Sequence, residues 1–184
     1  MIYQPEQDSY LLAEQIKIFV KGLDKSKNTS MLDMGSGSGI QAITAIQAGV
    51  NKKCILCADI NKETVVQLKK KNLIAIASDL FNKINRKYKF NLIVFNPPYL
   101  PEDKYDKQPD TTAGKRGNEM IIKFLKQAKA YLAEDGVILL LFSSLSHPEE
   151  ILKEAKKLRY DAERMAEKSA GMMERLYVYK LVLS

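Results

Sequence analysis

Short apolar runs alternate with amphipathic stretches along most of this chain. Runs of strand length lie at about residues 31–34, 54–58, 73–77, 91–95 and 137–142, with two further strands expected at about 161–166 and 175–183. Between them, apolar positions recur with helical spacing at about residues 8–20, 40–48, 62–71, 118–131 and 149–158. Asn118 is expected to cap the fourth of these helices. This order predicts an α/β fold, in which helices cover both faces of a mostly parallel, seven-stranded sheet.

The chain is expected to form one domain, because its 184 residues are enough for a sizeable single core. Residues 1–29 contain the first helix and its flanks, and the helix carries Leu11, Leu12, Ile16 and Phe19 on one stripe. After the fourth strand, residues 97–117 are polar and contain proline, which favours a substrate loop. With only about thirty residues before the first strand, no separate substrate-recognition domain is expected.

Charge and hydropathy narrow the class of protein. No apolar run approaches the roughly 20 residues of a membrane-spanning helix, and the N-terminus lacks a signal-peptide pattern. We therefore expect a cytoplasmic protein without a membrane partner. The net charge of +7 suits work beside RNA or ribosome-associated factors, although a lysine-rich solvated surface explains it equally well.

The two cysteines have a spacing that is typical of metal and redox sites. Cys54 and Cys57, however, fall in a predicted strand, where residues three apart point to opposite faces. We therefore expect two separate buried thiols and no metal site.

A glycine-rich turn follows the first predicted strand, with the sequence D-M-G-S-G-S-G at residues 33–39. A dinucleotide fingerprint would need a small residue where Ile40 stands, and no Gly-Lys-Ser/Thr of a phosphate-binding loop is present. The missing side chains, at Gly35 and Gly37 above all, still let the backbone approach a ligand closely. The turn therefore favours a nucleotide-type ligand without a pyrophosphate.

Acidic residues stand at or next to the ends of three successive apolar runs. Asp33 opens the glycine turn, Asp59 is placed to accept hydrogen bonds from two ribose hydroxyls, and Asp79 could face an adenine together with Leu80. One acid at a strand end is more often a helix cap than a ligand. Three of them beside a glycine turn favour S-adenosylmethionine as the cofactor.

The fourth predicted strand ends in a polar turn of the sequence N-P-P-Y, which is formed by Asn96, Pro97, Pro98 and Tyr99. The prolines have no N–H, so the turn presents carbonyl oxygens without competing donors. The Asn96 side-chain oxygen and a backbone carbonyl can each accept one hydrogen of an –NH2 group, and Tyr99 offers a flat face for stacking. This favours methylation of a planar nitrogen by positioning and electrostatics. The simpler alternative, a rigid turn with Asn96 as a capping residue, would need neither two prolines nor an aromatic residue.

With these motifs, the chain resembles the class I methyltransferases, and within them the HemK-type family that methylates a glutamine side-chain amide in translation release factors. The N-terminal segment Y-Q-P-E-Q-D-S at residues 3–9 is similar to the family's Y-x-P-A-E-D-S/T segment, which helps to close over the cofactor. A-G-K-R-G at residues 113–117 and R-L-Y-V-Y-K-L at residues 175–181 resemble two further family elements. The resemblance is to the short branch of the family and covers nearly the whole chain. It implies a Rossmann-like class I methyltransferase fold.

The resemblance also implies the roles of individual residues. Substrate contacts would come from Asn96 and the Pro97 carbonyl, beside Pro98, with Tyr99 stacking. Cofactor contacts would come from Ser9, Asp33, Gly35, Gly37, Asp59, Asp79, Leu80 and Asn96. The chain departs from the family at Glu6, where a small residue is usual, and at Gln7, where the family has Glu. The change at Gln7 removes one possible contact to the cofactor's ammonium group.

The third predicted strand, residues 73–77, begins with Leu73 and ends with Ala77, and it would form an edge of a class I sheet. It is apolar and lacks the lysine or proline that usually protects an edge. We expect either a partner protein or a covering loop on this edge. The resemblance favours a partner, since short members work with a small zinc-binding activator.

Two alternatives differ from glutamine methylation of a release factor. An RNA or DNA methyltransferase acting on adenine N6 or guanine N2 would share the N-P-P-Y chemistry and would suit the positive charge, but no target-recognition domain is evident. A non-catalytic scaffold would leave the complete set of cofactor and acceptor residues unexplained.

Overall fold

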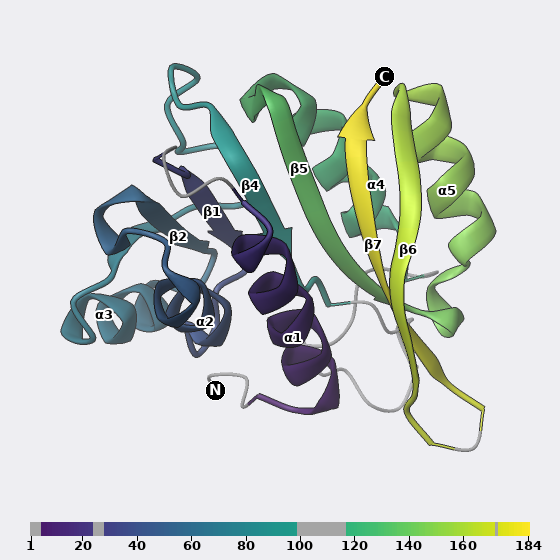
Figure 1. Cartoon of the computed structure of the whole chain (residues 1–184), viewed down its shortest axis with the longest axis horizontal. Coiled ribbons are helices and arrows are strands. Elements are labelled where there is room, and N and C mark those ends of the chain that lie inside the picture. Colours follow the sequence, from purple (N-terminus) through teal and green to yellow (C-terminus); the bar gives the residue numbers. More distant parts are fainter. Residues whose placement is uncertain (1–4, 24–27, 99–116, 172) are drawn as a thin grey trace.

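The computed structural model describes residues 5–23, 28–98, 117–171 and 173–184. In these residues seven strands form one sheet in the order β3-β2-β1-β4-β5-β7-β6 (Figure 1). The strands are β1 (Met31–Met34), β2 (Ile55–Asp59), β3 (Ile74–Ala77), β4 (Phe90–Phe95), β5 (Leu132–Ser143), β6 (Tyr160–Ser169) and β7 (Arg175–Leu183). Only the pairs β5·β7 and β6·β7 are antiparallel. The expected mostly parallel sheet is confirmed.

Helices cover both faces of this sheet, because each has one apolar stripe. One core cluster joins the sheet to α1 (Gln7–Lys21), α2 (Ile40–Ala48) and α3 (Lys62–Lys70). The other cluster joins the opposite face to α4 (Glu119–Ala128) and α5 (Pro148–Lys157). Three short 3₁₀ turns complete the described elements: Lys52–Cys54, Lys129–Tyr131 and Ser144–Ser146.

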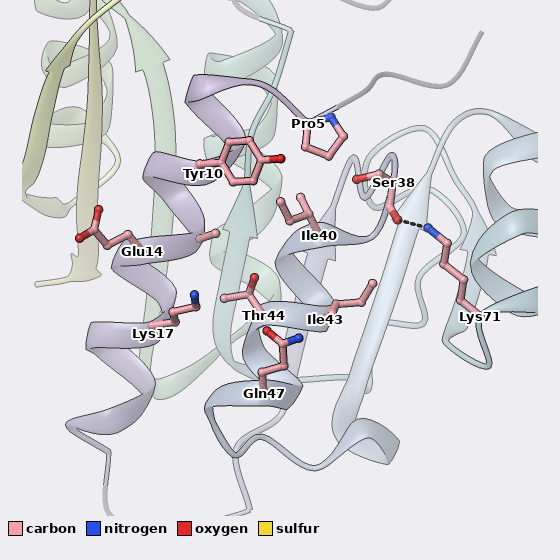
Figure 2. A pocket seen from close by; sticks show the side chains of 11 residues that line it. Pro5, Tyr10, Glu14, Lys17, Ser38, Ile40, Ile43, Thr44, Gln47 and Lys71 are labelled. Carbon is pink, nitrogen blue, oxygen red and sulfur yellow. Dashed lines mark hydrogen bonds between the residues drawn. The ribbon is translucent and has the colours of Figure 1, made fainter.

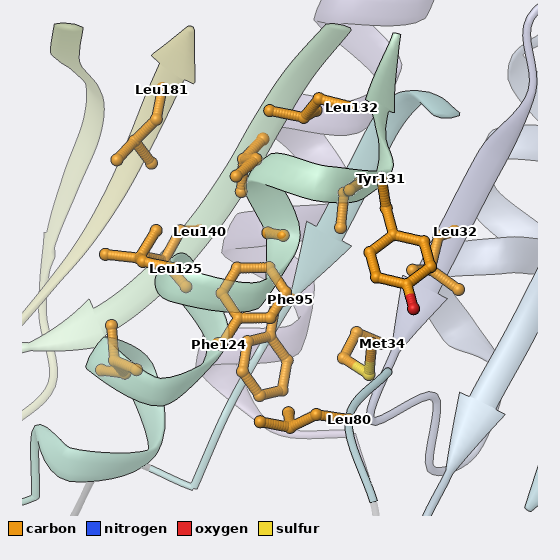
Figure 3. Packing of buried hydrophobic residues seen from close by; sticks show 14 of the residues in the cluster. Leu32, Met34, Leu80, Phe95, Phe124, Leu125, Tyr131, Leu132, Leu140 and Leu181 are labelled. Carbon is orange, nitrogen blue, oxygen red and sulfur yellow. The ribbon is translucent and has the colours of Figure 1, made fainter. Parts of the chain in front are cut away.

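The core beneath α4 fixes the end of β4. Phe95, the last residue of β4, is 2% exposed and packs on Phe124 with ring centroids 4.5 Å apart (Figure 3). Phe81 stacks on Tyr131 at 4.5 Å in the same cluster. Burying a phenylalanine contributes about 1.5–3 kcal/mol to the stability of the fold. Phe95 therefore anchors the end of β4, where the N-P-P-Y turn begins.

The order of the strands predicts where a ligand can bind. The chain adds β2 and β3 on one side of β1 and then returns to place β4 on the other side. In such a sheet, ligands bind outside the carboxyl ends of the strands where this reversal occurs. The glycine turn follows β1 and Asn96 follows β4, so the two motifs meet at this point.

Several details differ from the sequence predictions. β5 begins at Leu132, well before the predicted residue 137. The prediction missed this start because the stretch around Glu134 is polar and has no apolar pattern. Asn118 stands at the start of α4 but makes no side-chain cap; its Nδ2 donates to Glu150 Oε2 at 2.9 Å. Cys54 was expected in the strand and buried, but it lies in a 3₁₀ turn just before β2 and is only partly buried, because β2 begins at Ile55. Cys57 is buried in β2, as expected, and both cysteines are free.

The described residues lack both a membrane-spanning helix and a cluster of metal-binding side chains. None of their helices is both long and apolar enough to cross a membrane. They also contain no cluster of three or more His, Cys, Asp or Glu side chains suited to a metal ion.

Candidate active site

Sheet register aligns the two sequence motifs. Met34 pairs with Ala58 of β2 and with Phe95 of β4. The residues that follow these three, Gly35, Asp59 and Asn96, therefore lie at one level at the carboxyl edge of the sheet, with Asp59 as the last residue of β2. The register thus brings a backbone turn, a carboxylate and an amide to the same crevice.

The glycine turn is shaped for close approach of a ligand. Gly35 has a φ of 62°, and a Cβ there would come within 3.2 Å of the Phe95 ring. Gly37 has a φ of 49°, and its N–H donates to Asp59 Oδ2 at 2.9 Å. Such positive φ values are open to glycine at little cost. The missing side chains leave a cradle of backbone beside Asn96.

Asp33 lies under this turn and is only 1% exposed. Its Oδ2 accepts a hydrogen bond from the Ala42 N–H in the first turn of α2 at 3.2 Å. Burial raises the pKa of Asp33 from 3.8 to about 7, and the nearby Asp59 carboxylate adds to the rise. Asp33 therefore links the start of the glycine turn to the first turn of α2 from inside the protein.

The two later acids lie in different surroundings. Asp59 is 9% exposed and accepts from Gly37 and Asn61 N–H groups at 2.9 Å each, so its carboxylate holds the turn from the β2 side. Carboxylate oxygens have further lone pairs that could accept ribose hydroxyls. Asp79 lies beyond the end of β3, where it forms an ion pair with Lys123 at 3.0 Å. The Leu80 side chain is buried in the core, so a contact from Leu80 to a cofactor would have to involve its backbone.

The first turn of α1 reaches the same crevice. Ser9 is 3% exposed, and its carbonyl accepts a hydrogen bond from Gln41 Nε2 at 3.0 Å. Asp8, before it, is 4% exposed and accepts the Ser9 N–H on Oδ1. Its other oxygen, Oδ2, accepts from Asn96 Nδ2 at 3.0 Å. The predicted N-terminal segment is therefore joined both to α2 and to the N-P-P-Y turn.

Asn96 carries the most informative atom of the site. Its Oδ1 is buried and has no hydrogen-bond partner among the residues that the structure describes, whereas its Nδ2 donates to Asp8. An unpaired buried acceptor is costly and usually marks a place for a ligand donor. Pro97 is buried and Pro98 half-buried beside it. Tyr99 and most of the predicted substrate loop at 97–117 lie outside the described residues.

These residues fit S-adenosylmethionine. The glycine turn gives a cradle that a Cβ would fill, and Asp59 stands at the strand end where ribose hydroxyls would lie. The unpaired Asn96 oxygen adds an acceptor in the same place. The structure therefore brings together Ser9, Asp33, Gly35, Gly37, Asp59 and Asn96, while Asp79 and Leu80 lie past the end of β3.

Two residues of this network were absent from the predicted site. Asp8 belongs to the N-terminal motif, but nothing in the sequence indicated that its carboxylate would contact Asn96. Gln41 follows the glycine turn as an ordinary helix residue; it is 4% exposed and its Oε1 is also without a partner. Only tertiary contacts assign these side chains to the site.

A separate groove of about 830 Å³ lies between α1 and α2 (Figure 2). Tyr10, Glu14 and Lys17 line it from α1, and Lys71 closes one end by donating from Nζ to the Ser38 carbonyl at 2.8 Å. None of the predicted cofactor residues lines this groove. Ser38 of the glycine turn and Ile40 directly after it do line the groove, so it adjoins the turn.

Known proteins with similar sequences identify the family of the chain. The profile of the methyltransferase small domain family matches residues 14–167. A protein of Methanocaldococcus jannaschii, provisionally named a protein N5-glutamine methyltransferase, is 33% identical over 173 residues, covering 88% of this chain and 82% of its own. Methyltransferase HEMK2 of Homo sapiens is 27% identical over 197 residues, covering 100% of this chain and 90% of its own.

A solved structure has the same fold. In the E. cuniculi Mtq2–Trm112 complex, described as responsible for methylating the translation termination factor eRF1, one chain superposes with a TM-score of 0.76. It is 23% identical, and the match covers 100% of this chain and 99% of that chain. Fold, crevice and sequence agree: the chain belongs to the methyltransferase small domain family, as an S-adenosylmethionine-dependent methyltransferase of the HemK type.

Proposed function

We propose that this enzyme methylates the side-chain amide nitrogen of a glutamine in a protein, and that the protein is a peptide-chain release factor. The observation that carries the proposal is the buried, unpaired Asn96 Oδ1 at the ligand crevice. An acceptor in this place suits a substrate that brings an –NH2 group. The names of the M. jannaschii relative and of the Mtq2–Trm112 complex support the choice of substrate.

The site's own residues would make a poor nucleophile reactive. The nitrogen lone pair of an amide is delocalised into the carbonyl group. Two acceptors, Asn96 Oδ1 and the Pro97 carbonyl, would hold the two N–H hydrogens and so favour the geometry in which the lone pair faces the methyl donor. Tyr99 would stack on the planar amide.

S-adenosylmethionine would supply an electrophilic methyl group on a sulfonium. The glycine turn and Asp59 are the residues expected to hold it, with Ser9 and Asp33 supporting them from α1 and β1. Because amide methylation by positioning needs no strong base, the proposal assigns no residue to that role.

The test is transfer of labelled methyl from S-adenosylmethionine to recombinant release factor, with total RNA as a parallel acceptor. Mass spectrometry of the labelled protein should locate the methyl group on one glutamine, and replacing that glutamine should remove the label. Label on RNA alone would favour the alternative, a nucleic-acid amino-methyltransferase. That alternative is supported by the net charge of +7.

We also propose that β3 is the docking edge for a small zinc-binding activator. Among the described strands, β3 pairs only with β2, and Ile74 on it is 50% exposed. Val66 of α3 is 51% exposed, so a second large apolar side chain near this edge faces solvent. An unpaired strand beside exposed apolar side chains suits a partner that adds a strand. The partner in the Mtq2–Trm112 complex supports this choice.

The proposed substrate also indicates where in the cell the enzyme works. Release factors act on cytoplasmic ribosomes, so we propose that the enzyme works in the cytoplasm. Fractionation of cells that express a tagged chain should recover it with the cytosolic pool.

A further inference from the structure

Asp8 controls which way the Asn96 amide faces. The Asp8 side chain is 4% exposed, and its Oδ2 lies 3.0 Å from Asn96 Nδ2. An ionised carboxylate only accepts hydrogen bonds, so the Asn96 –NH2 group must turn toward it. As a result, Oδ1, the atom without a partner, faces away from Asp8.

The position of Asp8 is itself fixed by the fold. Its Oδ1 accepts the N–H of Ser9. The Ser9 carbonyl in turn accepts from Gln41 Nε2 at 3.0 Å, on the first turn of α2. The first turn of α1 is thereby joined to the helix that follows the glycine turn. These hydrogen bonds therefore fix the position of the Asp8 carboxylate beside Asn96 without a ligand.

We propose that Asp8 is a positioning residue for methyl transfer: it orients Asn96 Oδ1 toward the acceptor nitrogen and polarises the Asn96 amide. This inference rests on the proposed function and extends it to a residue that acts through Asn96. Electron density drawn to Oδ1 strengthens the bond it accepts from a substrate N–H, as in other charge-assisted networks.

The chemistry explains why a charge behind Asn96 would help. The acceptor nitrogen forms a bond to the methyl carbon as the carbon–sulfur bond breaks and its electron pair stays on sulfur. Positive charge then develops at the nitrogen, and one N–H proton leaves to water. The negative charge of Asp8, relayed through Asn96, would favour this transition state, in which positive charge moves from the sulfonium to the acceptor nitrogen beside Asn96.

The test compares Asp8→Ala and Asp8→Asn with the control Glu14→Gln, which removes an exposed carboxylate from the same helix. Three quantities are measured: kcat on the acceptor that the wild type methylates, the Kd for S-adenosylmethionine, and the NMR resonances of the Asn96 side-chain amide without ligands. Asp8→Ala should lower kcat by about 100-fold, the typical cost of a misplaced reacting group. It should leave the cofactor Kd unchanged and shift the Asn96 –NH2 resonances.

Asp8→Asn should retain more activity than Asp8→Ala, because an amide oxygen can still accept from Asn96 Nδ2. The inference is overturned if Asp8→Ala keeps the wild-type kcat, if the Kd rises by the same factor as kcat falls, or if the Asn96 resonances do not move. Should Asp8→Ala fail to fold, Asp8→Asn decides by the same three readouts. If the wild type methylates no glutamine, the proposed function fails, while the Asn96 resonances still decide the role of Asp8.

Discussion

At the scale of single residues, the site depends on which atoms are already paired. The sequence N-P-P-Y predicted that Asn96 would accept hydrogens from a planar amine. The structure adds that Oδ1, the accepting atom, has no partner among the described residues, whereas Nδ2 donates to Asp8. A residue type can be recognised in the sequence, whereas the orientation of its amide depends on a neighbour from another element.

Replacing Asn96 by alanine should abolish methyl transfer and leave most of the cofactor affinity. The variant loses the Asn96 Oδ1 acceptor, which has no partner among the described residues, while the glycine turn and Asp59 remain bonded to each other. Losses of 10²–10³-fold in kcat are common when one positioned electrostatic group is removed. The measurements are single-turnover transfer and calorimetric titration with S-adenosylmethionine. Equal loss of both would show that Asn96 serves the cofactor pocket.

Asp33 predicts a pH dependence of stability. Its pKa is raised by burial from 3.8 to about 7, so the folded protein favours the protonated carboxyl. This contribution to stability is complete below pH 3.8 and is lost as the pH rises to about 7. Each pH unit in this window costs about 1.4 kcal/mol at most. As the pH rises, the free energy of unfolding should therefore fall more in the wild type than in a variant without the Asp33 carboxyl.

Asp33→Asn tests this directly. Urea unfolding of both proteins without cofactor at pH 5, 6, 7 and 8 should show the wild type losing about 2–3 kcal/mol relative to the variant. The comparison uses the difference between the two proteins, so other titrating groups cancel. Parallel curves for the two proteins would mean that Asp33 is ionised throughout this range.

At the scale of elements, the glycine turn combines two separate demands. Gly37 has a φ of 49°, and a Cβ there would meet only the Gly35 carbonyl oxygen at 3.9 Å, so packing does not require this glycine and we propose that it serves the ligand. Gly39 has a φ of 81°, and a Cβ there would lie 2.7 Å from Leu68 and 3.1 Å from Leu73, both of which are buried. The last glycine of the motif therefore lets the start of α2 pack closely on Leu68 of α3 and on Leu73 before β3.

Gly39→Ala and Gly37→Ala form a matched pair, because both place alanine at positive φ. Each should lose about 1–2 kcal/mol from backbone strain. Gly39→Ala should lose about 1–3 kcal/mol more, because the new methyl group overpacks the core. Unfolding in urea without cofactor measures the difference, and calorimetric titration should show the weaker cofactor binding in Gly37→Ala. Equal losses of stability would contradict the packing role of Gly39.

Elements with a clear apolar period were predicted well, and elements defined by pairing were not. β4 and α2 lie within a residue of their predicted positions, because the spacing of their apolar residues indicates which positions are buried. β5 extends back to Leu132 because Phe90 of β4 pairs with it, across a register shift. Such a partner cannot be read from a polar stretch. Asn118 shows the same limit, since its side chain bonds to Glu150 of α5 and not to its own helix.

At the scale of the whole molecule, the exposed edge at β3 is the feature to test. Ile74→Lys should abolish co-elution with the zinc-binding activator, because a charge on the strand opposes both burial and strand addition. It should leave folding intact, since Ile74 is 50% exposed. Ile18→Lys on α1, where Ile18 is 55% exposed, is the matched control. Loss of the complex in both variants, or in neither, would argue against docking at β3.

The sequence by itself determined the class of fold, the single sheet with helices on both faces, and the two motifs that define the site. Period and turn chemistry are local properties, so the residues encode them directly. Only the tertiary structure decided that Asp8 and Gln41 belong to the site, that Asp33 is buried enough to hold a proton near neutral pH, and that Asn96 keeps one free oxygen. Each of these depends on distant segments meeting in space. The free energy of such a contact is set by burial and partner geometry, which no short stretch of sequence contains.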